Sequence, residues 1–288
     1  DTTESRLVVL SPAESIHVEL TGQGPPVVLI PGLFGAAFGF RHVVPLLTKA
    51  GYRTIVIEPL AIGRSSRPAG ADYSSSAQAV RIAAVLDSLK LRNVLVIGHS
   101  IAGSLAFRLA YQRPDLVAGV LSLEGGPAET MVTSGFRRAL RFGPAIKLLG
   151  GVELIRYQTR EQLIDASGDK GWITDDVVRG YTAGAARDLG GTLKAYRAMS
   201  RAREAEPLAP RLAEIRSPVV LLVGTAPHHA DVAPEEIEKL HRSLPAFSVD
   251  SVPGAGHYLH EERPAAVLDA LQYLRRRVAE ASAAVARP

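Results

Sequence analysis

The sequence predicts an α/β protein with a mostly parallel sheet of eight strands, flanked by helices, and a helical cap inserted after the sixth strand. Two observations support this fold class. Short apolar runs rich in β-branched residues alternate with segments whose apolar residues recur at helical spacing. This alternation stops between residues 127 and 210, where amphipathic helical fragments dominate and no apolar strand is evident. We therefore expect a core domain of residues 1–126 and 211–288 and a cap, or lid, domain of residues 127–210.

The first half of the chain supplies six of the expected strands. They are residues 6–10, 15–20, 27–30, 54–57, 94–97 and 117–123. The first two are joined by Ser11-Pro12-Ala13 and read as an antiparallel pair. Residues 37–50 can form a helix that ends at Gly51, and residues 74–89 carry apolar residues at helical spacing. Strands that alternate with helices in this way run parallel, and their carboxyl ends form the edge where ligands bind.

After residue 210 the alternation of strands and helices resumes. Residues 219–223 and 247–252 are the last two expected strands, with a helix from about Pro234 to Leu244 between them. A final helix begins at Pro264. We expect the alanine- and arginine-rich residues after about Val278 to fray.

Composition narrows the classes of function. The 288 residues are 47% hydrophobic and 22% charged, which is typical of a globular protein. The formal charge is only +4 without a Lys/Arg-rich block, so we expect no nucleic-acid partner. No apolar run reaches the length of a membrane span. Disulfides, thiolate metal sites and a cysteine nucleophile are excluded because the chain has no cysteine. The chain starts at Asp1 without methionine or a signal peptide, which leaves a cytoplasmic and an exported protein equally open.

The stretch from Val94 to Ala110 carries the strongest sign of chemistry. A short apolar strand runs into a turn of small residues centred on Ser100, and a helical pattern follows. Strand, tight turn and helix around a serine form a nucleophile elbow, in which small neighbours are needed because strand and helix nearly touch. Gly98 and Ala102 flank the serine, so an alanine replaces the second glycine of the Gly-x-Ser-x-Gly pattern. The alternative is that Ser100 is only a turn residue that caps the helix.

Further motifs follow one another in a specific order. Residues 28–33 (VLIPGL) are an apolar strand that runs into a Pro-Gly turn, and residues 63–66 (GRSS) end the loop after the next strand. The elbow comes third, and residues 253–264 (PGAGHYLHEERP) place a histidine between glycines and the last helix. With these motifs, the chain resembles the α/β-hydrolase superfamily, in its capped branch of serine esterases, related to the epoxide hydrolases and haloalkane dehalogenases. The resemblance covers roughly residues 25–126 and 211–275.

The resemblance implies roles for several residues. Ser100 is the expected nucleophile and His257 the base that activates it, because an uncharged hydroxyl needs a base beside it. The backbone N–H groups of Leu33 and Ile101 are the expected oxyanion hole. A serine suits acyl transfer, whereas epoxide hydrolases and haloalkane dehalogenases use an aspartate nucleophile. The acid of the triad, which fixes the tautomer of the histidine, is less evident.

Two carboxylates compete for the role of the acid. In most of the superfamily an aspartate stands three or four residues past the glycine that ends the seventh strand, but Pro227 and His228 occupy these positions after Gly224. Asp231 lies seven residues past that glycine, in a lengthened loop. Glu124 directly follows the sixth strand, next to the elbow strand, where some relatives place their acid. We favour Glu124 and keep Asp231 as the alternative.

The remaining histidines have structural interpretations. His228, His229 and Asp231 could be metal ligands, but adjacent histidines usually diverge, so a solvated loop is favoured and no metal site is expected. His99 precedes the nucleophile and is expected to pack or hydrogen-bond behind the elbow, and His260 is expected to be structural.

These residues predict a serine hydrolase that cleaves a carboxylic ester of a small to medium apolar substrate and needs no cofactor. A C–C bond hydrolase, a lactonase or a thioesterase would use the same triad, and a non-catalytic ligand-binding protein of the same fold is the alternative from another class. The oligomeric state is left open between monomer and dimer. Seven residues of the cap could line the substrate pocket or, more ordinarily, pack the cap onto the sheet: Phe136, Phe142, Leu148, Leu149, Trp172, Tyr181 and Tyr196.

Overall fold

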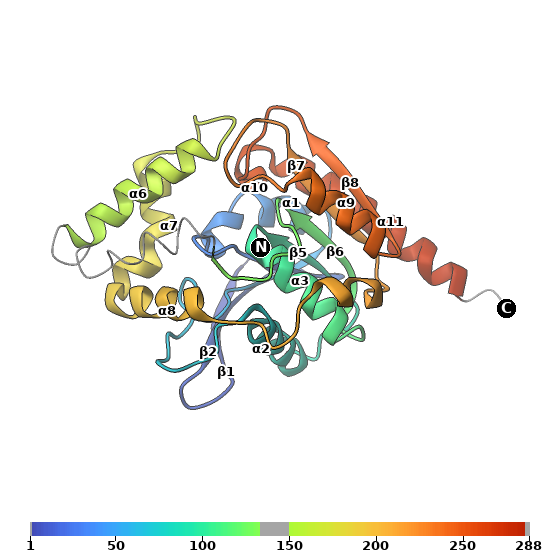
Figure 1. Cartoon of the computed structure of the whole chain (residues 1–288), viewed down its shortest axis with the longest axis horizontal. Coiled ribbons are helices and arrows are strands. Elements are labelled where there is room, and N and C mark those ends of the chain that lie inside the picture. Colours follow the sequence, from blue (N-terminus) through green and yellow to red (C-terminus); the bar gives the residue numbers. More distant parts are fainter. Residues whose placement is uncertain (1, 133–149, 286–288) are drawn as a thin grey trace.

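The computed structural model describes residues 2–132 and 150–285 and contains an eight-stranded sheet with helices on both faces (Figure 1). The strands are β1 Glu4–Val9, β2 Ser15–Thr21, β3 Pro26–Ile30, β4 Arg53–Ile57, β5 Val94–His99, β6 Val117–Leu123, β7 Val219–Gly224 and β8 Phe247–Val252. All eight expected strands are present, which confirms the predicted fold class.

The order of strands in the sheet is β1-β2-β4-β3-β5-β6-β7-β8. β1 pairs antiparallel with β2, as expected from the sequence, and β2 pairs antiparallel with β4. Every other neighbouring pair is parallel. The carboxyl ends of β3, β5, β6, β7 and β8 therefore meet at one edge, and β5, which leads to Ser100, lies between β3 and β6.

Two hydrophobic layers hold the helices to the sheet. The helices of the core are α1 Val43–Lys49, α2 Ser75–Ser88, α3 Ile101–Gln112, α9 Pro234–Ser243 and α11 Pro264–Val285. One layer contains buried residues of α2, α3 and α9, and the other contains those of α1 and α11. The side chain of Ser74 accepts a hydrogen bond from the N–H of Ala77 and so begins α2 where the sequence indicates.

One expected helix is divided. Residues 37–50 form a 3₁₀ turn, η1 Ala37–Phe40, and then α1, so a single helix over this range is wrong. The N–H of Ala37 donates to the buried carboxylate of Glu58 at 2.8 Å. Arg41 pairs with the buried carboxylate of Glu261, far along the chain. These contacts fix the first turn separately from α1.

The end of the last helix also differs from the expectation. α11 continues to Val285, so fraying from about Val278 is wrong. Val278 packs against the hydrophobic layer that holds α11, and the alanines that follow favour a helix.

Helices also follow the sixth strand, where the sequence predicts a helical cap. Its described helices, α6 Gly151–Asp165, α7 Asp175–Arg187 and α8 Leu189–Arg201, lie together on one side of the molecule in Figure 1. The short helix η3 Ala209–Glu214 leads back to β7. The domain boundaries, a core of residues 1–126 and 211–288 and a cap of residues 127–210, stay a prediction.

The cap rests on a small apolar cluster of its own. Tyr181 of α7 is buried with Leu163, Val177 and Val178, and this cluster includes Tyr258 of the core. The rings of Tyr181 and Phe38 contact each other at 5.9 Å between centroids. The packing role expected for Tyr181 is thereby confirmed. Phe136, Phe142, Leu148 and Leu149 lie outside the described residues. None of the described helices is both long and apolar enough to cross a bilayer.

Candidate active site

Ser100 lies on a sharp, strained turn between β5 and α3. Its φ of 57° and ψ of −125° lie in a region that L-residues rarely adopt. Its N–H donates to the carbonyl of Leu123 at 2.8 Å, which ties the turn to β6. A Cβ at Gly98 would lie 2.3 Å from the carbonyl oxygen of Ala102, so strand and helix touch as the motif requires. The side chain of Ser100 accepts no capping hydrogen bond, which disfavours the role of a mere helix cap.

A close approach of α3 to β6 occurs at a glycine that the motif does not mark. A Cβ at Gly103 would lie 2.2 Å from Ser122 Oγ, and one at Gly125 would lie 2.3 Å from the carbonyl oxygen of Ser100. Ala102 is fully buried and its methyl fits. The helix thus approaches β6 closely at Gly103, one residue after the position where the motif has its second glycine.

Ser100 and His257 line the same cavity at the carboxyl edge of the sheet. The cavity has a volume of about 570 Å³, within the range of small-molecule sites. Glu124 and Asp231 also reach its wall. Its apolar lining includes Leu33, Phe34, Ile101, Met131, Val132 and Val232. Such a lining favours an apolar ligand.

The two expected oxyanion donors border this cavity. Ile101 is the first residue of α3, so its N–H has no acceptor within the helix. The loop of Leu33 lies directly against the elbow, because a Cβ at Gly32 would be 3.2 Å from Ser100 Cβ. The carbonyl of Leu33 accepts a hydrogen bond from the hydroxyl of Tyr196 in α8 at 2.9 Å. The cap thus holds the peptide group that follows Leu33.

The loop of His257 is fastened by backbone contacts to the cap. The N–H of His257 donates to the carbonyl of Ala166 at 2.7 Å. Glu262, in the short helix α10 Leu259–Glu262, accepts the N–H of Gly256 with one carboxylate oxygen and those of Gly168 and Asp169 with the other. One carboxylate therefore joins the histidine loop to the segment that follows α6.

The imidazole of His257 is held neutral. Burial lowers its pKa well below the usual value, and the neighbouring His99 and His228 lower it further, against a backbone hydrogen bond with Ala230 that raises it. A general base needs this uncharged state. The Nδ1 of His257 has no partner among the described residues, and in that part of the chain no hydrogen bond joins its ring to Ser100 Oγ.

Glu124 ends β6 in a left-handed backbone conformation, with φ of 52°. Its N–H donates to the carbonyl of Leu222 at 3.0 Å, and one carboxylate oxygen accepts the N–H of Gly224. Burial raises the pKa of Glu124 to about 8, and the hydrogen bond from Gly224 opposes this shift. Asp231, in contrast, is exposed and lies at the wall of the cavity.

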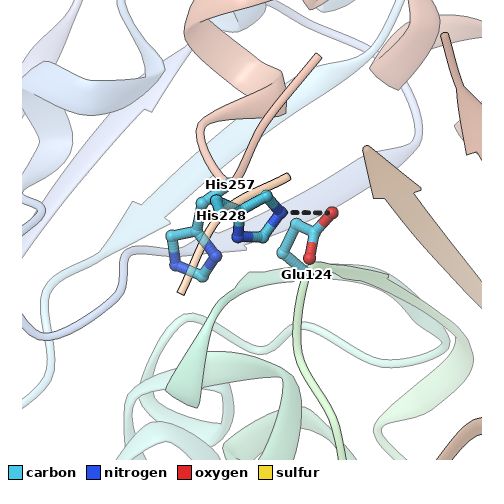
Figure 2. A group of neighbouring side chains, drawn as sticks. All are labelled: Glu124, His228 and His257. Atoms are coloured by element: carbon cyan, nitrogen blue, oxygen red, sulfur yellow. Dashed lines mark ion pairs between the residues drawn. The ribbon is translucent and has the colours of Figure 1, made fainter. Parts of the chain in front are cut away.

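Figure 2 shows Glu124 and His257 together with a third side chain, His228. One ligand atom from each residue lies within 4.8 Å of the others, and His228 Nε2 is 3.6 Å from Glu124 Oε1. The side chain of His228 is completely buried, so a solvated loop is the wrong interpretation for this residue, although it fits the exposed His229. A signal existed in the sequence, because His228 stands four residues past Gly224, where the resemblance leads one to expect the acid.

The comparisons with known proteins agree with this architecture. A family model described as the alpha/beta hydrolase fold matches residues 25–264. The chain belongs to this family.

Among curated relatives, the uncharacterized hydrolase YugF of Bacillus subtilis is 27% identical over 246 residues, 82% of this chain and 85% of that protein. The sn-1-specific diacylglycerol lipase ABHD11 of Xenopus laevis is 26% identical over 252 residues, 86% of this chain and 78% of that protein. The solved epoxide hydrolase CorEH has a TM-score of 0.80 and 19% identity, with 96% and 100% of the two chains covered, and shows the fold alone.

In this alpha/beta hydrolase two other histidines, His99 and His260, are buried near the elbow. His99 Nε2 lies 2.9 Å from the carbonyl oxygen of His257, and burial lowers the pKa of His99 to about 4. His260 is buried against it, with 4.3 Å between the ring centroids. His99, the last residue of β5, thereby joins the histidine loop to the elbow strand.

Proposed function

We propose that this alpha/beta hydrolase cleaves a carboxylic ester of a small to medium apolar substrate through an acyl-enzyme formed on Ser100. One observation carries the proposal: an uncapped serine hydroxyl on a strained turn shares an apolar cavity of about 570 Å³ with a buried, neutral His257. The strand, turn and helix around the serine are those of a nucleophile elbow.

In the proposed reaction, Ser100 Oγ attacks the ester carbonyl while His257 takes the hydroxyl proton. The N–H groups of Leu33 and Ile101 stabilise the oxyanion. His257 then returns the proton to the departing alkoxide, which leaves as the alcohol. Water, deprotonated by the same imidazole, releases the acid and restores the serine. Catalytic hydrogen bonds are often long before substrate binds, so the contact between Ser100 and His257 is expected to tighten in the complex.

Glu124 is the proposed acid of the triad, in preference to Asp231. Its carboxylate is buried beside His257, whereas that of Asp231 is exposed. A buried carboxylate stabilises the imidazolium that forms during the reaction more strongly than an exposed one, because water screens it less.

The apolar cavity wall and the relatives support an ester as substrate. The curated name of ABHD11 describes a diacylglycerol lipase, an enzyme that acts on ester bonds. A C–C bond hydrolase, a lactonase and a thioesterase need the same serine and histidine and are distinguished only by substrate. A panel of p-nitrophenyl esters of graded acyl length, tested beside lactones, thioesters and diketones, identifies the bond by its kcat/KM.

The nucleophile is tested with a fluorophosphonate probe, which labels activated serines. We expect the wild-type protein and a Ser251→Ala control, changed at an exposed serine, to be labelled, and Ser100→Ala to remain unlabelled. Ester turnover by Ser100→Ala should fall by at least about a thousandfold. If the wild-type protein stays unlabelled and turns over no ester but binds an apolar ligand, the proposal is wrong and the chain is a binding protein.

A further inference from the structure

Four polar side-chain atoms are left without partners in the interior beside the cavity. They are Glu124 Oε2, both ring nitrogens of His228, and His257 Nδ1. Buried polar groups are nearly always paired, and each one left unsatisfied costs about 1–3 kcal/mol. Because these atoms belong to one cluster, a single bound species could pair with one atom of each residue, although it could not reach both ring nitrogens of His228.

The atoms offered by the cluster suit one kind of ligand. A carboxylate oxygen and two imidazole nitrogens, each from a buried side chain, lie within 4.8 Å of one another. Imidazoles select transition metals such as zinc, whereas magnesium and calcium prefer oxygen ligands. Zinc bonds of about 2.0–2.1 Å in a tetrahedral site bring the ligand atoms to about 3.4 Å from one another. The three atoms therefore have to approach one another by up to about 1.4 Å, which side-chain rotation and the loop of His228 can provide.

The surroundings fit a metal site as well. The three ligands come from the end of β6 and from the loops after β7 and β8, so they converge from separate elements (Figure 2). Glu124 Oε1, which lies 3.6 Å from His228 Nε2, also accepts the N–H of Gly224, a contact that orients the carboxylate. Glu124 and His257 border the cavity of Ser100, so a fourth position would open toward it.

We propose that Glu124, His228 and His257 form a binding site for one Zn²⁺ ion. This inference departs from the expectation of no metal site drawn from the sequence. It rests on the geometry of the three side chains and not on the proposed ester hydrolysis. If that function holds, bound zinc would stop acyl transfer, because His257 could not accept a proton while it ligates the ion.

Zinc binding is tested by isothermal titration calorimetry on the tag-free full chain. We expect about one Zn²⁺ per chain, no binding of Mg²⁺, and a d–d absorption band when Co²⁺ replaces zinc. His228→Ala and Glu124→Gln should each weaken binding at least about tenfold. His229→Ala, which removes the adjacent exposed histidine, is the matched control and should bind zinc as the wild type does. Circular dichroism of each variant checks that it is folded. If His228→Ala does not fold, His228→Asn takes its place.

The outcomes separate this proposal from the proposed function. Ser100→Ala should bind zinc with the affinity of the wild type, although it cannot form an acyl-enzyme. Absence of zinc binding by the wild type, equal binding by His228→Ala, or loss of binding only in His229→Ala would overturn the zinc site. A protein that binds zinc through His228 but hydrolyses no ester keeps the zinc site and loses the proposed function.

Discussion

Glu124 combines a strained backbone with a buried carboxylate at the end of a central strand. Its backbone has a φ of 52°, and its side chain accepts a hydrogen bond from the N–H of Gly224, the last residue of β7. A glutamate that only capped a strand would not need this conformation. The strain and the burial together support the proposal that Glu124 is the acid of the triad, because such features cluster at active sites.

We expect Glu124→Gln and Asp231→Asn to affect turnover differently. The first removes the buried carboxyl group beside His257, whose negative charge would balance the imidazolium, and should lower kcat on a p-nitrophenyl ester by orders of magnitude. The second changes an exposed carboxylate and should be mild. Steady-state kinetics of the two variants measure this directly, and the opposite ranking would show that Asp231 is the acid.

The buried side chain of His99 makes the stability of the fold depend on pH. Its pKa is about 4 in the fold and about 6.5 when exposed, because burial penalises the charged ring. Between these two values the unfolded chain takes up a proton that the folded chain does not. The stability due to neutral His99 is thus complete above pH 6.5 and is lost as the pH falls toward 4, by roughly 3 kcal/mol in total.

His99→Gln tests this expectation, since glutamine keeps a donor for the carbonyl of His257 but does not titrate. The free energy of unfolding, measured with urea between pH 7 and 4, should fall less steeply in the variant than in the wild type. Identical slopes would mean that His99 is not the group that titrates.

At the scale of elements, α8 of the cap is joined to the loop after β3. The hydroxyl of Tyr196 donates to the carbonyl of Leu33, and its ring packs edge-on against Phe34 with 5.9 Å between centroids. The proposed oxyanion donor at Leu33 therefore depends on a residue that is far away in the sequence. Tyr196 is a positioning residue in this proposal.

We expect Tyr196→Phe to keep the ring contact and lose only the hydrogen bond. If Leu33 donates to the oxyanion, kcat should fall about 10-fold or more while KM changes little, because the transition state loses more than the ground state. Tyr157→Phe, at an exposed tyrosine of α6, is the control and should behave as the wild type. A rise in KM alone would indicate that Tyr196 shapes substrate binding instead.

For the molecule as a whole, the sequence was sufficient to predict the fold wherever apolar strands and amphipathic helices alternate regularly. All eight strands, their largely parallel order and the helical insertion follow from apolar runs and helical spacing. The division of residues 37–50 into two helices could not be predicted from the sequence. It depends on contacts with Glu58 and Glu261, which only the folded chain brings close to these residues. The burial of His228 could not be predicted for the same reason. Its position four residues after Gly224 is visible in the sequence, but its burial beside Glu124 depends on how a lengthened loop folds.

Glu262 joins the loop of His257 to the segment that follows α6, and a substitution at this residue tests that connection. Its carboxylate accepts three backbone N–H groups, from Gly256, Gly168 and Asp169. In Glu262→Gln the amide cannot accept all three as well, so we expect a loss of stability of about 1–3 kcal/mol. Faster hydrogen exchange at Gly168 and Asp169 should accompany a lower kcat. Glu280→Gln, at an exposed position of α11, is the control, and unchanged exchange at Gly168 would contradict the expectation.

The bond from His257 N–H to the carbonyl of Ala166 has a practical consequence for protein engineering. New substrate preferences are often sought by grafting the lid of one enzyme onto the body of another. Here such a graft would also replace the residue whose carbonyl holds the loop of His257, so we expect a chimera that exchanges only the insertion to misplace the imidazole. A successful exchange would have to transfer residues 254–262 along with the donor lid.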